Sequence, residues 1–208
     1  GRAILEGRNE DGTDIHSVNR DALGWAGKEG RDKAKTFIYA FLYGAGDELL
    51  GAMVVPNGTP EQKKRAGRKL KKKFLDAIPA LKHLTDAVSR KAKEQGYLLL
   101  PDGRRVYIRH QHAALNSLLQ GAGAVICKAW IVEFSRRLTE EFGEQGWDGQ
   151  WAALGWIHDE VQIACRPEIA PRVCEILVES IRHITEVFNW RLPLDGEAKV
   201  GANWKETH

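Results

Sequence analysis

The chain has 208 residues, of which 43% are hydrophobic and 28% are charged, and its formal net charge is +3 at neutral pH. This length suits one large domain or two small lobes with a substantial core, and the composition is ordinary for a globular protein. A net charge of +3 is too small to indicate a nucleic-acid partner by itself, so the positions of the charges carry more information.

Cysteine usage and hydropathy indicate the compartment. Cys127, Cys165 and Cys174 show no close pairing motif, which favours free thiols over a zinc site. We find no apolar run near the roughly 20 residues that span a bilayer and no signal peptide, so we expect a cytoplasmic protein with no membrane partner. Because the chain begins at Gly1 and its one methionine is Met53, we expect a C-terminal piece of something longer.

The first half of the chain is predicted to be mostly helical. Residues 1–30 indicate turns around a short helix over 15–23, and the next helix runs from Arg31 to a stop at Gly44. Thr59 and Pro60 are a helix start, with threonine as the N-cap and proline in the first turn. The remaining predicted helices of this half cover about 48–54, 60–78 and 80–95.

The second half mixes strands and helices. Apolar runs at 97–100 and 105–109 flank Pro101-Asp102-Gly103, which predicts a hairpin. A long, largely buried helix is expected over 112–142, then strands over 153–157 and 161–165, a helix over 167–189 and an irregular strand over 192–204. The predicted fold class is therefore α+β, with a helical, basic first half and antiparallel strands in the second.

Four side chains recur every four residues in the helix after residue 30: Arg31, Lys35, Tyr39 and Tyr43. On a helix they form one drifting stripe. Arginine and lysine suit phosphates, and tyrosine offers a flat apolar face with a polar tip. The spacing fits a triphosphate at one end and a base at the other, and it fits an amphipathic surface helix equally well.

A basic segment follows, with eight lysines and arginines between Lys63 and Lys73 and no acid among them. Such a run either tracks a polyphosphate backbone or forms a solvated helix face, and the sequence leaves both interpretations open.

The segment His158-Asp159-Glu160 puts two carboxylates at the tip between two apolar strands. Hard oxygen ligands of this kind suit Mg²⁺, which completes its coordination with phosphates and water. Aspartate is also a common turn residue, so the tip alone does not decide the question. Together with the cation-aromatic helix, a carboxylate-held metal describes phosphoryl or nucleotidyl transfer.

A third set of polar residues, His112, Asn116 and Gln120, again steps by four along a helix. Asparagine and glutamine amides can donate to the purine N3 and pyrimidine O2 acceptors that every base pair shows in the minor groove. One polar residue per turn is also ordinary on a half-buried helix.

In this order, the three segments resemble the DNA polymerase I superfamily (family A), most closely the replicative type of short-tailed phages. The first resembles the pattern Arg-x3-Lys-x3-Tyr/Phe-x3-Tyr-Gly of the fingers helix, and the tip resembles the palm hairpin motif. The resemblance implies a right-hand fold: a palm-to-fingers connection over 1–16, a fingers subdomain over 17–110 and the C-terminal part of the palm, an antiparallel sheet, over 111–208.

The resemblance also implies roles for the first set of residues. Arg31 and Lys35 would bind the phosphates of the incoming dNTP, and Lys35 would donate a proton to departing pyrophosphate. His16 would lie near the β-phosphate. Tyr39 would pack on the nucleotide sugar and base, and Tyr43 would hold the template strand.

The second set would contact metal and DNA. Asp159, with Glu160 beside it, would ligate catalytic Mg²⁺, and His158 would lie near the primer end of the primer-template DNA. Asn116 and Gln120 would contact the minor groove. His112 stands where bacterial members usually carry arginine.

The family's Asp-x-Ser-x-x-Glu motif, which supplies the second metal-binding aspartate, is not present in this sequence. Its position would precede Asp14-Ile15-His16. We therefore expect the chain to need an upstream polymerase segment or subunit with the thumb and the first palm strands. By itself it should have little or no activity.

Two rival functions compete with the polymerase interpretation. A non-catalytic DNA- or nucleotide-binding remnant would retain its role without Asp159. A single-metal phosphohydrolase would turn over nucleotide without DNA, which leaves the pair Tyr39 and Tyr43 unexplained.

Overall fold

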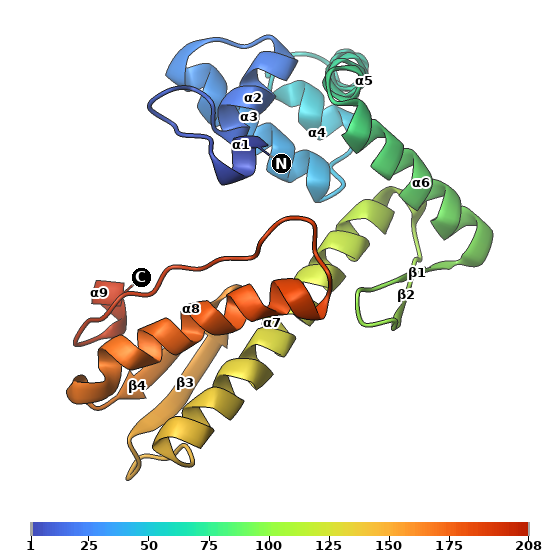
Figure 1. Cartoon of the computed structure of the whole chain (residues 1–208). Helices are drawn as coiled ribbons and strands as arrows, with labels where there is room; N and C mark the ends of the chain where they lie inside the picture. The colour runs from blue at the N-terminus through green and yellow to red at the C-terminus, as the bar shows by residue number, and fades with distance from the viewer. Residues whose placement is uncertain (1, 208) are drawn as a thin grey trace. The chain divides into compact units, whose positions relative to one another are not determined.

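The computed structural model describes residues 2–207, which form two compact units (Figure 1). Among the described residues, unit 1 comprises 2–99 and Arg105–Leu119, and unit 2 comprises Leu100–Arg104 and 120–207. Mixed helices with two small antiparallel sheets confirm the α+β class.

Unit 1 is built mainly from helices. They are α1 (Arg2–Leu5), α2 (Ile15–Leu23), α3 (Gly27–Leu42), α4 (Asp47–Ala52), α5 (Pro60–Ala77) and α6 (Pro79–Gln95). The hairpin of β1 (Tyr97–Leu99) and β2 (Arg105–Tyr107) follows, and the short 3₁₀ helix η1 (Gln111–Ala113) then leads into α7 (Ala114–Phe142), which continues into unit 2.

Local chemistry sets most of these boundaries. Thr59 and Gln62 form a reciprocal capping box at the start of α5, with Pro60 in the first turn. Gly24 and Gly96 end α2 and α6 in the left-handed conformation that glycine adopts without strain. The helix α3 begins at Gly27, four residues before the predicted start.

An aromatic cluster forms the core of unit 1. Phe37 and Phe41 of α3 meet Phe74 of α5 edge to face, with ring centroids 5.1 and 5.7 Å apart. Phe37 and Phe74 are fully buried, and burial of each such side chain contributes about 1.5–3 kcal/mol. The apolar residues of α3 therefore anchor the helix to the core of unit 1.

Two glycines bring α4 and α5 into close contact. A Cβ at Gly51 would lie 1.8 Å from the Lys63 carbonyl oxygen, and one at Gly67 would lie 1.8 Å from that of Asp47. No side chain fits at either position without moving the backbone, so these glycines determine how α5 crosses α4.

Unit 2 pairs a β-hairpin with two long helices. Its elements are the second part of α7, the antiparallel strands β3 (Trp151–Ile157) and β4 (Glu160–Cys165), the 3₁₀ helix η2 (Pro167–Ile169), α8 (Ala170–Val187) and α9 (Trp204–Thr207). Trp151 pairs with Cys165 and Ile157 with Glu160, and the register shifts between Ala153 and Gly155.

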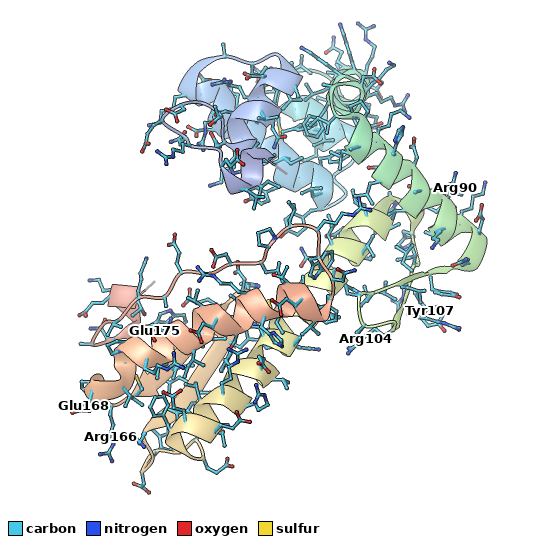
Figure 2. The ribbon with its side chains drawn as sticks, in the orientation of Figure 1. Arg90, Arg104, Tyr107, Arg166, Glu168 and Glu175 are labelled. Atoms are coloured by element: carbon cyan, nitrogen blue, oxygen red, sulfur yellow. The ribbon has the colours of Figure 1, made fainter. Side chains whose placement is uncertain are left out.

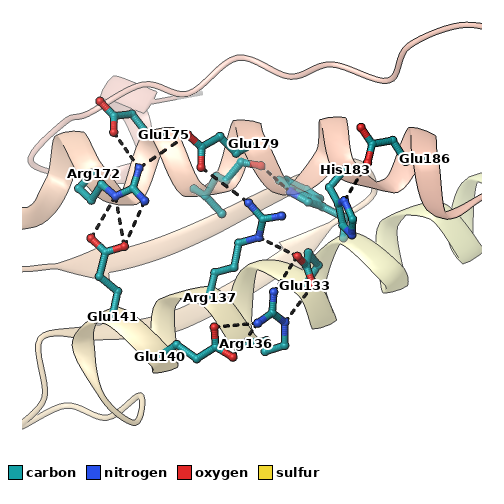
Figure 3. Close-up of polar contacts among 12 residues, drawn as sticks. Glu133, Arg136, Arg137, Glu140, Glu141, Arg172, Glu175, Glu179, His183 and Glu186 are labelled. Atoms are coloured by element: carbon teal, nitrogen blue, oxygen red, sulfur yellow. Dashed lines mark hydrogen bonds and ion pairs between the residues drawn. The ribbon is translucent and has the colours of Figure 1, made fainter.

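The helices α7 and α8 are joined by packing and by charge. Trp151, Phe134 and Ile176 are buried together, and the Trp130 indole donates to the Leu177 carbonyl at 2.8 Å. Figure 3 shows the ion pairs that cross between the helices. Arg172 bonds to Glu141 at 3.0 Å, and Arg137 lies 3.7 Å from Glu179.

Two expectations about the second half are wrong. The helix over 111–142 is not largely buried: only 11% of its most apolar window lies inside the protein. By length and composition it is the one described helix that could cross a membrane, a test that core helices also pass. No strand forms over 192–204; most of this segment has no regular structure, and α9 begins at Trp204.

Candidate functional site

Asp14 organises the candidate site of unit 1. Its carboxylate caps α2, accepting from the His16 backbone N–H at 2.9 Å and from the Ser17 hydroxyl at 2.6 Å. The same carboxylate accepts from Nε and Nη2 of Arg31 on α3, at 3.2 and 2.9 Å. One side chain therefore fixes the start of α2 against the first turns of α3.

The ion pair between Asp14 and Arg31 is largely sheltered from solvent, with side-chain exposures of 13% and 21%. Its bonds to Arg31 hold the pKa of Asp14 well below its ordinary value, and the carboxylate raises the pKa of Arg31. The guanidinium is thus oriented by a carboxylate and has part of its charge balanced before any ligand arrives.

His16 lies beside this ion pair. Burial lowers the pKa of His16, and the charges of Arg31 and Lys35 lower it further. The imidazole is therefore neutral at pH 7. Its ring centroid lies 6.1 Å from that of Tyr39, and its buried Nδ1 has no hydrogen-bond partner among residues 2–207. Buried polar atoms normally have partners, so this nitrogen is a point where a ligand or a water can bind.

The stripe on α3 lies at the surface, as its spacing predicts. Lys35 is exposed and has no ion-pair partner in the part of the chain that the structure describes. Tyr39 and Tyr43 are 47% and 59% exposed. The structure thus brings His16, Arg31, Lys35 and Tyr39 to one face of unit 1.

The end of α3 meets the start of α7 within unit 1. Gly44 has φ +79°, and a Cβ there would lie 3.0 Å from the His112 carbonyl oxygen. Glycine is thus favoured by both conformation and space, and Tyr43 is held next to the turn that leads to Asn116. Asn116 is half-buried, and Gln120, one turn further along α7, is exposed.

Several cations of the basic helix α5 bond to other elements of unit 1. Arg68 and Lys71 both bond to Asp47 of α4, at 3.0 and 2.9 Å. Lys73 donates to the Leu23 carbonyl at 2.8 Å. These contacts favour the structural interpretation of the basic run for the residues that make them.

The candidate site of unit 2 is the tip between β3 and β4. Because Ile157 pairs with Glu160, His158 and Asp159 alone form the turn. His158 has φ +56°, a left-handed conformation that is uncommon for residues other than glycine, although histidine adopts it more often than most. The Trp156 indole donates to the His158 carbonyl at 2.6 Å and supports the turn.

The two carboxylates of the tip differ in their surroundings. Asp159 is exposed, and no hydrogen bond or ion pair reaches its side chain within residues 2–207. Burial raises the pKa of the Cys127 thiol on α7, and the charge of Asp159 raises it further, so that thiol lies near the tip. Glu160 accepts from the Trp204 indole at 2.9 Å and from Gln162. The C-terminal helix α9 thereby contacts the tip.

The described residues contain no cluster of three or more histidine, cysteine or acidic side chains that could hold a metal. Asp159 and Glu160 do match the preference of Mg²⁺, which takes one or two carboxylates and keeps water and phosphate as its other ligands. The tip fits a part of such a site.

Asp14 and Trp204 have structural roles that no motif in the sequence indicates in full. Aspartate just before a helix is an N-cap signal, which predicts the cap but not the bond to Arg31. Trp204 contacts Glu160 from 44 positions away, and no local pattern indicates that contact.

Comparison with known proteins gives consistent matches. A family model described as DNA polymerase family A matches residues 4–206. The chain is 45% identical to a DNA-directed DNA polymerase of Enterobacteria phage T3 and 42% identical to that of Escherichia phage T7. Each alignment covers 94% of this chain and 29% of the relative. The chain thus spans under a third of the length of these relatives.

Among solved structures, the fold is similar to the POL domain of Pol1 from M. smegmatis, determined in complex with DNA primer-template and dNTP. The TM-score is 0.66 at 19% identity, over 89% of this chain and 32% of that chain.

Proposed function

The chain belongs to DNA polymerase family A, and from this premise we propose that it forms the fingers and the C-terminal palm of a template-directed DNA polymerase. Residues 1–16 would connect palm to fingers, 17–110 would form the fingers, and 111–208 would belong to the palm. The reaction is nucleotidyl transfer from a dNTP to the 3′-hydroxyl of a primer.

The face organised by Asp14 is the observation that carries this proposal. A neutral imidazole with an unpartnered nitrogen, an oriented guanidinium and an unpaired ammonium lie together beside a tyrosine ring. This set suits a triphosphate followed by a base. Arg31, Lys35 and His16 would hold the phosphates, Lys35 would protonate departing pyrophosphate, and Tyr39 would pack on the sugar and base.

A second set of residues would hold DNA. Gly44 brings the end of α3 against His112, and this contact puts Tyr43 near the turn before Asn116. Tyr43 would contact the template strand, and the amides of Asn116 and Gln120 would donate to minor-groove acceptors without reading sequence.

Asp159 and Glu160 would hold Mg²⁺, with His158 near the primer end. When bound, the metal would stabilise negative charge on the reacting phosphate. Asp159 is exposed and lacks a partner within the described chain, which leaves its oxygens available. The Trp204 indole keeps one oxygen of Glu160 in a fixed place. A second aspartate would have to come from an upstream segment.

Two features of unit 2 support such an upstream partner. Only 11% of the most apolar window of α7 is buried, and β3 and β4 form a sheet of two strands. Both are surfaces on which further palm strands can pack. As a phage-type polymerase, the assembled enzyme would act in the cytoplasm of the host cell.

A chimera tests the proposal directly. The 208 residues would replace the matching segment of the phage T3 relative, and primer extension with Mg²⁺ would be compared for the chimera and for the isolated chain. We expect extension by the chimera and little or none by the isolated chain. Robust extension by the isolated chain would contradict the need for an upstream segment.

The rival function is a non-catalytic remnant that still binds DNA or nucleotide. It predicts a folded chimera that binds primer-template without extending it. The two functions therefore separate in one assay.

A further inference from the structure

The hairpin β1–β2 displays an aromatic and cationic face that the proposed active site does not use. Tyr97 pairs directly with Tyr107, and Leu99 pairs with Arg105. Side chains alternate across a strand, so these four residues lie on one face, and Leu98 and Val106 lie on the other. Figure 2 shows Tyr107 projecting from the outer side of the hairpin.

The inner face anchors the hairpin. Leu98 is 4% exposed within the main core cluster of unit 1, and Val106 and Ile108 pack against that cluster. The loop Pro101-Asp102-Gly103 closes the hairpin, with Gly103 at φ +82° as three-residue loops favour. The outer face is therefore held by a rigid support.

Two rings and a guanidinium form the outer face. The centroids of Tyr97 and Tyr107 lie 6.1 Å apart, and Cζ of Arg105 lies 4.7 Å from the Tyr97 centroid. Arg105 thus covers one ring in a cation–π contact, whereas Tyr107 is 72% exposed. Such an open ring is a stacking surface.

The charge of this hairpin is positive. Between residues 97 and 109 the chain carries Arg104, Arg105 and Arg109 against one acid, Asp102, which is paired with Arg104. Arg105 is therefore a cation on the face with the tyrosines, and residues 97–109 place no unpaired acid beside it.

We propose that the face formed by Tyr97, Arg105 and Tyr107 binds single-stranded DNA, with a base stacked on Tyr107 and a backbone phosphate on Arg105. Aromatic platforms beside cations bind single strands in this way, without reading sequence. The inference rests on the proposed function only for the identity of the strand, which would be unpaired template. Exposed tyrosine and arginine also occur at protein interfaces, and the absence of balancing acids on this face favours DNA.

The experiment measures fluorescence anisotropy of a labelled oligo-dT with the full chain, in EDTA and without nucleotide. Substitution Y107A should weaken binding about tenfold, and Y107F should retain it, because the ring and not the hydroxyl stacks. R105Q should weaken binding and reduce the slope of log K against log salt by about 0.7.

Matched controls lie in unit 2. Trp147, 84% exposed, and the exposed Arg166 are changed to alanine and glutamine, respectively, and neither change should alter binding. Thermal unfolding establishes that each variant is folded. Equal affinity of Y107A and the unmodified chain for oligo-dT would overturn the proposal. It would also be overturned if Y107A lost assembly with the upstream segment but still bound oligo-dT.

Because the assay contains neither metal nor dNTP, its outcome is independent of catalysis. A chain that binds oligo-dT through Tyr107 but gives an inactive chimera would retain this inference and lose the proposed function. An active chimera, together with full affinity of Y107A for oligo-dT, would support the proposed function and contradict this inference.

Discussion

The two candidate sites differ in how much of their chemistry the chain itself supports. In unit 1, Asp14 bonds to the start of α2 and to Arg31, so the cationic face is organised from within. In unit 2, the turn exposes Asp159 without a partner among residues 2–207. The proposed phosphate face is thus organised within one folded unit, whereas the proposed metal site would need a carboxylate from elsewhere.

The largest effect is expected at the tip of unit 2, where the proposed metal site is incomplete. In the chimera, Asp159→Asn should lower the rate of primer extension about a hundredfold or more, because the proposed Mg²⁺ site loses a charged ligand and the metal would no longer be held at the reacting phosphate. Extension kinetics and dNTP affinity would be measured together, and the affinity should change little. Asp148→Asn, an exposed acid in the same unit, is the matched control. If Asp159→Asn still extended primers, the tip would not be the metal site.

The second-largest effect is expected at the face of unit 1 that Asp14 organises. Asp14→Ala removes an N-cap and leaves Arg31 without its carboxylate, so we expect a loss of about 2 kcal/mol in the free energy of unfolding of unit 1. Hydrogen exchange resolved to peptides of α2 and α3 would localise the loss. Asp21→Ala, on the same helix but with a side chain 62% exposed, should cost far less. Equal exchange in the two variants would show that Asp14 does not organise the face.

Glu133 is a partly buried carboxylate of unit 2 that has no proposed binding role. Two arginines hold the pKa of Glu133 at about 2, with Arg136 the stronger influence. The depressed pKa means that Glu133 stabilises unit 2 above about pH 4.5 and loses that contribution as the pH falls toward 2. Glu133→Gln should cost about 1–2 kcal/mol at pH 7 and flatten the acid limb of stability against pH.

Denaturant unfolding at several pH values measures the effect of Glu133→Gln, with the exposed Glu168→Gln as its control. Affinity for dNTP should be unchanged in both variants. A change of that affinity in Glu133→Gln would mean that packing in unit 2 also supports the phosphate face.

The smallest expected effect is a titration. Burial and the neighbouring cations lower the pKa of His16, so NMR of the imidazole should give a value below 6.5 in the free protein. A bound triphosphate brings negative charge near the ring and should raise that pKa. Substitution His16→Gln assigns the resonance. A pKa that is unmoved by saturating dNTP would place the phosphates away from His16.

The sequence predicts this fold well wherever a local signal sets an element. The capping box at Thr59, the stop at Gly96 and the turn at Gly103 each act within a few residues, and each is present. The two failures have different causes. Residues 192–204 include Pro193, Gly196 and Gly201, which disfavour a strand, and no strand forms there. Apolar content alone could not tell that α7 is mostly half-buried, because burial depends on contacts with segments far away in the sequence.

The candidate sites follow the same rule. Spacing along one helix was enough to predict the stripe on α3, and hydropathy was enough to predict the tip at Asp159. The bond of Asp14 to Arg31 spans 17 positions and that of Glu160 to Trp204 spans 44, so neither leaves a periodic trace. The functional roles of the site residues remain predictions that the experiments above test.

The left-handed backbone at His158 has one more consequence. Glycine at position 158 would adopt φ +56° with less strain than histidine does, so we expect the turn to be more stable with glycine there. His158→Gly should therefore raise the melting temperature of unit 2 while impairing the chemistry at the primer end. The tip is a place where selection for stability and selection for activity would choose different amino acids.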